Sequence, residues 1–175
     1  MSVLPFAIRA AVPADAPALA HLGEVSFVAK FGSLYRPADL AAFIEAVYTP
    51  AALAAELADP ERRLAVAEAG DRLLAYVKLA LTSTFVAHAR GARPMELKQL
   101  YTAPDATGGG LGASLLAWAM QEARALGADE LQLSVWSGND GARRFYARHG
   151  FVRVADVPFQ VGDQIDDDVL YARML

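Results

Sequence analysis

Three consecutive glycines stand directly before a segment that reads as a helix. Gly108, Gly109 and Gly110 follow an expected strand at 95–102, and Gly112 comes two residues later. Glycine destabilises a helix relative to alanine, because it loses more backbone freedom on folding. We therefore expect this run to serve another purpose, which is to let a ligand approach the backbone N–H groups of the helix start without a Cβ in the way.

The order of the expected elements places this run in a mixed α/β sheet. Alternating apolar residues predict strands, apolar residues at helical spacing predict helices, and Pro, Gly and Asp mark the breaks. Strands are expected at 6–11, 63–70, 72–83, 95–102, 130–136, 151–159 and 168–175, and helices at 13–29, 37–48, 49–59, 111–126 and 139–150. One strand–helix–strand crossover, between 95 and 136, predicts a parallel pair in a mostly antiparallel sheet, within a single domain 1–175.

The glycine segment favours an anion site over a simple connection. A helix N-terminus carries unpaired N–H groups and the positive end of the dipole, so a phosphate or pyrophosphate is the natural ligand. A flexible or tight loop is the plain alternative. The segment does not end in Gly-Lys-Ser/Thr, so it does not support a nucleoside triphosphatase loop. Gly108, Gly110 and Ala113 match the dinucleotide pattern G-x-G-x-x-A, but only one parallel unit surrounds them.

Composition argues against several classes of protein. The 175 residues are 55% hydrophobic, which is enough for a full core, and the absence of cysteine removes disulfides, thiolate nucleophiles and Cys-based metal sites. A net charge of −4 argues against a nucleic-acid partner and is compatible with a cationic substrate. No metal site is expected. The start of the chain is broken by Arg9 and Pro13 and does not read as a signal sequence, so we expect a cytoplasmic protein without a membrane partner.

Two further patterns flank the expected strand at 130–136. Before it lies MELKQLYTAPDATGGGLGASLL, at 95–116, and after it lies N-x-x-A-x-x-F-Y followed by G-F. The second pattern is formed by Asn139, Ala142, Phe145, Tyr146, Gly150 and Phe151. Together they resemble the acetyl-coenzyme A binding core of the GCN5-related N-acetyltransferase (GNAT) superfamily, with Thr107 where Gln or Arg is usual. The resemblance implies helices on both faces of the sheet and a parallel pair that splays apart to admit the coenzyme.

The rest of the chain resembles, more loosely, the bacterial spermidine/spermine acetyltransferase branch of that superfamily. The similar segments are 27–57, AYVKL at 75–79, VW at 135–136, and a C-terminal F-x-x-G-D followed by an acidic position. The tail consists of Phe159, Gly162, Asp163 and Asp168. It implies a polyamine acceptor, although Asp166 and Asp167 stand where the branch more often has uncharged polar residues. The acidic set either draws in a polyamine or forms a solvated turn between the closing strands.

The resemblance also implies how the coenzyme is bound. Backbone groups of the strand before the loop would pair with the pantetheine arm and donate to the acetyl oxygen, whereas the plain reading is ordinary sheet pairing. Asn139 would bond to the same arm, and it is also a good helix cap. The implied coenzyme-binding residues are Leu100, Tyr101, Thr102, Thr107, Gly108, Gly109, Gly110, Leu111, Gly112, Ala113, Asn139 and Tyr146.

Acetyl transfer to an amine needs a neutral amine, donors for the oxygen of the tetrahedral intermediate and a proton for the departing thiolate. The lack of cysteine favours direct attack in a ternary complex over an acyl-enzyme. Tyr146 matches the superfamily's Tyr and is the expected acid, with core packing beside Phe145 as the alternative. Glu96 is the expected base, with a surface carboxylate paired with Lys98 as the alternative.

Three function classes stay open. An acetyl-CoA-dependent N-acetyltransferase of a small primary amine leads, with an amino acid, an antibiotic or a protein N-terminus as alternative acceptors. A silent coenzyme A module and a nicotinamide-type oxidoreductase are the others, and Tyr146 and Asn139 favour the enzyme over the silent module. His88 and His149 are rival titrating groups, expected to be exposed or at a helix end. The family resemblance allows a homodimer.

Overall fold

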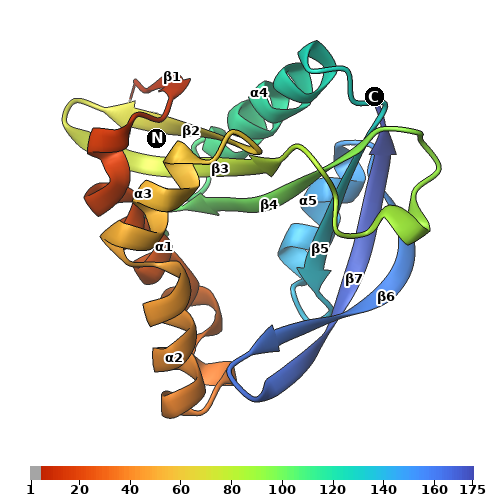
Figure 1. Ribbon diagram of the computed structural model, residues 1–175. Helices are drawn as coiled ribbons and strands as arrows, with labels where there is room; N and C mark the ends of the chain where they lie inside the picture. Colours follow the sequence, from red (N-terminus) through yellow and green to blue (C-terminus); the bar gives the residue numbers. More distant parts are fainter. Residues whose placement is uncertain (1–4) are drawn as a thin grey trace.

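The computed structural model describes residues 5–175. The first four residues of the predicted domain, which belong to the segment that does not read as a signal sequence, lie outside the described residues. Within them, seven strands form one sheet in the order β1-β2-β3-β4-β5-β7-β6 (Figure 1). The strands are β1 (Ala7–Ala10), β2 (Arg62–Ala69), β3 (Arg72–Ala80), β4 (Pro94–Thr102), β5 (Glu130–Trp136), β6 (Val152–Val161) and β7 (Gln164–Met174). The helices are α1 (Ala16–Phe31), α2 (Pro37–Val47), α3 (Pro50–Ala58), α4 (Leu111–Ala125) and α5 (Asp140–Arg148), with short 3-10 turns η1 (Pro13–Asp15), η2 (Gly32–Leu34), η3 (Val86–His88) and η4 (Pro104–Ala106).

The predicted mixed sheet is confirmed, and its parallel pair splays. All neighbouring strands run antiparallel except β4 and β5, which pair only as far as Glu96 and Gln132 and then separate (Figure 1). Lys98 is an extra residue in β4, because Leu97 and Gln99 pair with consecutive residues of β3. Such a bulge bends its strand and strengthens the local twist. The bend therefore lies where β4 leaves β5.

Helices cover both faces of the sheet, as the resemblance implied. On one face, α1 and α3 pack around Tyr76 and Val66 of the sheet. On the other face, α4 and α5 pack against the sheet, and Leu115 and Leu116 of α4 are fully buried there. Each such leucine contributes roughly 2 kcal/mol of hydrophobic stabilisation. The apolar stripe predicted for the helix at 111–126 is the face that α4 buries.

The closing hairpin is longer than predicted, which corrects the expectation of a solvated acidic turn. Strand β6 continues to Val161 and β7 begins at Gln164, so only Asp163 of the acidic set lies in the turn, and 166–168 lie in β7. The turn itself needs Gly162, whose φ is +58°. The strands continue past the polar stretch because Val161 is fully buried in a cluster with residues of α1 and α2.

The tip of this hairpin is tied to the start of α2, near the foot of that helix in Figure 1. Asp39 accepts a hydrogen bond from the backbone N–H of Asp163 at 2.9 Å and from Nε of Arg36 at 2.7 Å. These bonds hold the pKa of the Asp39 carboxyl below its usual range. The tip of the hairpin is thereby attached to the first turn of α2.

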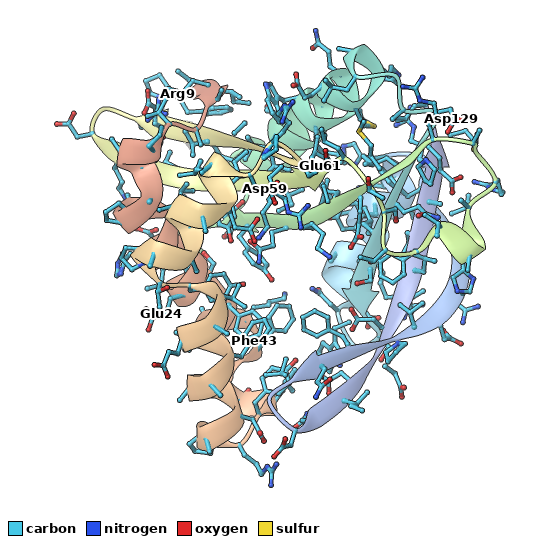
Figure 2. The ribbon with its side chains drawn as sticks, in the orientation of Figure 1. Arg9, Glu24, Phe43, Asp59, Glu61 and Asp129 are labelled. Carbon is cyan, nitrogen blue, oxygen red and sulfur yellow. The ribbon has the colours of Figure 1, made fainter. Side chains whose placement is uncertain are left out.

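Polar side chains of β5 hold the segment that connects β3 to β4. Glu130 accepts hydrogen bonds from the backbone N–H groups of Arg90, at 2.7 Å, and Gly91, at 2.6 Å, and Gln132 accepts one from Ser83. Asp129, labelled in Figure 2, binds two further N–H groups of the same segment. Glu130 and Gln132 are fully buried, so the connection is fixed over the closed end of the parallel pair.

Between residues 5 and 175, no single helix is long and apolar enough to cross a membrane; α2 and α3 meet that test only as a pair bent by 42°.

Candidate active site

A cavity of about 520 Å³ lies where β4 and β5 separate. Residues 96–101 of β4 and 133–136 of β5 form its two sides, and α5 contributes Ala142 and Tyr146, together with its capping residue Asn139. The structure thus brings together Glu96, Leu100, Tyr101, Asn139 and Tyr146, which the sequence predicted for one site. Of the other predicted residues, Phe159 and Asp168 line the cavity, whereas 102, 107–113, 162, 163, 166, 167 and both candidate histidines do not.

Aromatic side chains from distant segments form the far wall of the cavity. Phe27 of α1 lies 4.7 Å from Phe43 of α2, measured between ring centroids, and Phe43 lies 6.0 Å from Phe159 of β6. Figure 2 shows Phe43 pointing from α2 toward the space enclosed by the sheet and the hairpin. Phe31 meets Trp136 of β5 at 6.4 Å. The sequence reading missed this wall; the four-residue spacing of Phe27 and Phe31 on one helix was the available signal.

Two of the glycines before α4 are required by the backbone. Gly108 has φ +85° and Gly110, the residue that caps α4, has φ +79°, both in the left-handed region that glycine favours. A Cβ on either would meet nothing within 4 Å, so the space around them is open. Gly109 has no positive φ. The run therefore both turns the chain and leaves the N–H groups of the helix start accessible, which fits a pyrophosphate.

The glycine segment adjoins the cavity through the packing of α4 on α5. A Cβ on Gly112 would lie 3.6 Å from the ring of Phe145, so the first turn of α4 rests beside α5. Thr107, which stands where Gln or Arg is usual in the superfamily, uses its hydroxyl to donate to the carbonyl of Pro104 at 3.4 Å. Thr107 thus makes a local bond within the loop.

Tyr146 is buried and lines the cavity, whereas the neighbouring Phe145 packs toward α4. Burial, followed by the nearby Tyr101, raises the pKa of Tyr146 well above its usual value near 10. The hydroxyl is therefore protonated at neutral pH. Within residues 5–175 it has no hydrogen-bond partner, so it is free to donate. Asn139 caps α5, because its side chain accepts from the N–H of Ala142 at 3.1 Å.

Glu96 forms the predicted ion pair with Lys98, at 2.8 Å, but it is not on the surface. Only 3% of Glu96 is exposed. Its other oxygen accepts hydrogen bonds from the backbone N–H of Thr84, at 2.9 Å, and from the Thr84 hydroxyl, at 2.7 Å. The alternative of a surface carboxylate was wrong, because the segment after β3 folds over this part of β4.

A second ion pair, with a buried lysine and a half-buried carboxylate, lies on the cavity wall. Lys78 of β3 donates to Glu56 of α3 at 3.1 Å. Burial lowers the pKa of Lys78, and the Glu56 carboxylate opposes that shift. The sequence reading did not single out either residue, since their contact depends on how α3 packs on the sheet.

Asp168 of β7 also lines the cavity and is 5% exposed. Within residues 5–175, its Oδ1 atom has no hydrogen-bond partner. Burial, with a smaller contribution from Asp166, raises the pKa of Asp168 to about 6, although Ser134 opposes the shift. Asp166 differs, because it accepts a hydrogen bond from the hydroxyl of Tyr35 at 2.5 Å.

The candidate histidines lie elsewhere. His88 is exposed in η3, and His149 ends α5 with its Nδ1 2.8 Å from the carbonyl oxygen of Phe145. Over the described part of the chain, no three His, Cys, Asp or Glu side chains are grouped as metal ligands would be.

Comparison with known proteins places this arrangement in a family. Residues 29–151 match the model of the Acetyltransferase (GNAT) family. An uncharacterised N-acetyltransferase of Mycobacterium tuberculosis is 31% identical over 166 residues, covering 92% of this chain and 98% of the relative. One from Lactobacillus delbrueckii is 27% identical over 163 residues, covering 92% of each.

A solved structure shares the fold over nearly the whole chain. It is that of the PaiA N-acetyltransferase from Thermoplasma acidophilum in complex with coenzyme A, with a TM-score of 0.78, 19% identity, and coverage of 98% of this chain and 99% of that one. The family match spans both the glycine segment and the Asn139 to Tyr146 pattern. The chain therefore belongs to the GNAT family and is an acetyl-CoA-dependent N-acetyltransferase.

Proposed function

We propose that this enzyme transfers the acetyl group to the primary amine of a small molecule by direct attack within a ternary complex. One observation carries the proposal: a single cavity joins the gap between β4 and β5, where Tyr146 lies, to a chamber lined by the aromatic wall of Phe27, Phe43 and Phe159 and by carboxylates. Coenzyme and acceptor could therefore meet in one space. A stepwise acyl-enzyme would need a nucleophile such as cysteine, which the sequence lacks.

In this proposal the coenzyme is bound mainly by backbone. The N–H groups of Gly108–Gly112, with Leu111 and Ala113 in the first turn of α4, hold the pyrophosphate. The pantetheine arm then lies along Leu100–Thr102, since β4 beyond Glu96 has lost β5 as its partner and offers free hydrogen-bonding groups on that edge. The amide of Asn139 supports the arm. That the Thermoplasma structure of the same fold holds coenzyme A supports coenzyme A as the ligand of this fold.

The chemical step divides between the acceptor, the strand and Tyr146. The amine nitrogen attacks the acetyl carbonyl carbon, and N–H groups of β4 stabilise the oxygen of the tetrahedral intermediate. The bond from carbon to sulfur then breaks, and the departing thiolate takes the proton of the Tyr146 hydroxyl. That hydroxyl suits the role, because burial keeps it protonated and it has no other partner in the described chain.

The lining of the chamber favours a cationic acceptor. Aromatic faces attract cations, and buried carboxylates do so more strongly. A polyamine is our first candidate, and an amino acid, an antibiotic or a protein N-terminus are the alternatives. Glu96 stays a candidate base, although its carboxylate oxygens already accept three hydrogen bonds from Thr84 and Lys98.

Two measurements test the proposal. Calorimetric titration with acetyl-CoA, with NAD as the control ligand, tests the loop, and thiol release over a panel of spermidine, spermine and simple amines tests the acceptor. Tyr146→Phe should lower kcat roughly 100-fold or more and leave the Kd of acetyl-CoA unchanged. Tyr171→Phe is the matched control, because the Tyr171 hydroxyl bonds to Arg143 outside the cavity.

Each outcome removes a different part. Full turnover by Tyr146→Phe would exclude Tyr146 as the acid. Thiol release with other amines but not with polyamines would discard the polyamine. No binding of acetyl-CoA would overturn the role of the glycine segment.

A further inference from the structure

The ionic groups of the cavity wall do not balance. Lys78 pairs with Glu56, and Lys98 pairs with Glu96. The wall carries one more carboxylate, that of Asp168. Within residues 5–175 no cation pairs with it. A buried carboxylate without a partner costs stability, so its presence calls for an explanation other than folding.

The groups that face Asp168 come from several elements and supply no positive charge. They are Asp166 on its own strand, Ser134 of β5, Tyr101 of β4 and Tyr35 from the turn before α2. Asp166 is satisfied by Tyr35. Two buried oxygens of the wall have no hydrogen-bond donor within residues 5–175, Oε2 of Glu56 and Oδ1 of Asp168. Nε of Arg62 lies 3.4 Å from the Glu56 oxygen, whereas no cation lies beside the Asp168 oxygen. The missing cation is therefore expected from the ligand in the cavity.

The position of Asp168 along the sheet brings it near the proposed acid. Asp168, Tyr101 and Tyr146 all line the same cavity. Burial raises the pKa of Tyr101 to about 12 against a hydrogen bond with Tyr48 that lowers it, and the negative charge of Asp168 is a smaller contribution to the rise. Glu96 lies further down the sheet.

The strand register gives the size of that separation. Asp168 is opposite Trp136 of β5, whereas Glu96 is opposite Gln132, four residues earlier. Four residues of strand span roughly 13 Å. An acid and a base that act on one tetrahedral centre need to flank it, and Asp168 lines the same cavity as Tyr146, at a level of the sheet different from that of Glu96.

We propose that Asp168 receives the ammonium group of the acceptor and removes its proton, while Glu96 serves as the partner of Lys98. The proposal rests on the proposed function. An ammonium acceptor carries three N–H protons and the amide product carries one. Of the two that leave, one ends on the coenzyme sulfur by way of Tyr146, and the other passes through the Asp168 carboxylate to solvent.

Asp168→Asn tests this assignment, with Asp167→Asn as the matched control, because Asp167 is the exposed neighbour on the same strand. Thiol release would be followed with spermidine and benzylamine from pH 5 to pH 9. Asp168→Asn should lower kcat/KM roughly 100-fold or more at pH 8 and abolish the rise of kcat/KM through pH 6, with the Kd of acetyl-CoA unchanged. Asp167→Asn should keep that rise.

Retention of the rise through pH 6 in Asp168→Asn, or its loss in Glu96→Gln alone, would overturn the proposal. If the unsubstituted enzyme releases thiol with neither amine, the proposed acceptor class fails, and Asp168 is judged by calorimetric binding of the same amines at pH 8. Binding that disappears in Asp168→Asn supports the ammonium site. Equal binding in both proteins, or none in either, refutes it.

Discussion

Replacing Asp168 by asparagine is expected to stabilise the folded protein at neutral and alkaline pH. The pKa of this carboxyl is about 6 in the folded chain, against an ordinary value of 3.8. The folded state therefore holds its proton between about pH 4 and pH 6, where the unfolded chain has released it. Because the folded state binds more protons in this window, its free energy of unfolding falls as the pH rises through it.

The size of the effect follows from the shift. Two pKa units correspond to about 3 kcal/mol, which is an upper limit. The carboxylate faces an open cavity, so solvent screening reduces the expected gain to about 1–2 kcal/mol. For a chain of this length, that gain raises Tm by about 2–8 °C. Asparagine keeps the size of the side chain and removes the charge.

Urea unfolding at intervals from pH 4 to pH 8 measures the difference in free energy of unfolding between Asp168→Asn and the unsubstituted protein. The difference should be near zero at pH 4, increase up to about pH 6 and then stay constant. Asp167→Asn should give a flat difference. A flat curve for Asp168→Asn, or a loss of stability at pH 8, would refute the reasoning about the buried charge.

Three other substitutions test separate parts of the structure. Gly110→Ala forces a left-handed backbone on alanine, so it should lower the free energy of unfolding in urea by about 1–2 kcal/mol and weaken the binding of acetyl-CoA in calorimetry. Gly109→Ala should do neither, and equal effects of the two substitutions would contradict the argument from φ. Leu115→Ala empties a fully buried site of α4 and should cost about 2–5 kcal/mol, so a loss below 1 kcal/mol would count against the packing. Asp39→Asn loosens the hairpin tip, and should raise the KM of the amine while the Kd of acetyl-CoA is unchanged.

Local patterns predicted the elements well where periodicity was clear and poorly where charge interrupted it. The stripe of α4 and the alternation of β5 gave both elements within a residue or two. The acidic stretch 166–168 suggested a turn, yet it lies in β7, because Val161 on the opposite strand is buried against α1 and α2. That burial depends on long-range packing, which no window of sequence contains.

The site was predictable only where one short segment carries it. The glycine segment and the pair Asn139 and Tyr146 each lie within one short segment, so the sequence alone could propose them, and their roles stay predictions. The aromatic wall, the pair of Lys78 with Glu56, and the free oxygen of Asp168 each need contacts between distant elements. Burial of Glu96 likewise needs the connection that Glu130 holds in place.

The bulge at Lys98 changes which side chains of β4 face the cavity, and the sequence of β4 reflects it. Side chains of a regular strand alternate between faces, so residues three apart point to opposite sides. Leu97 and Leu100 nevertheless both pack in the core beneath α4, because the extra residue shifts the alternation. The same shift turns Glu96 and Tyr101 to the cavity. A departure from alternation in β4 thus marks the place where the strand bends and leaves β5, the edge along which we propose that the coenzyme lies.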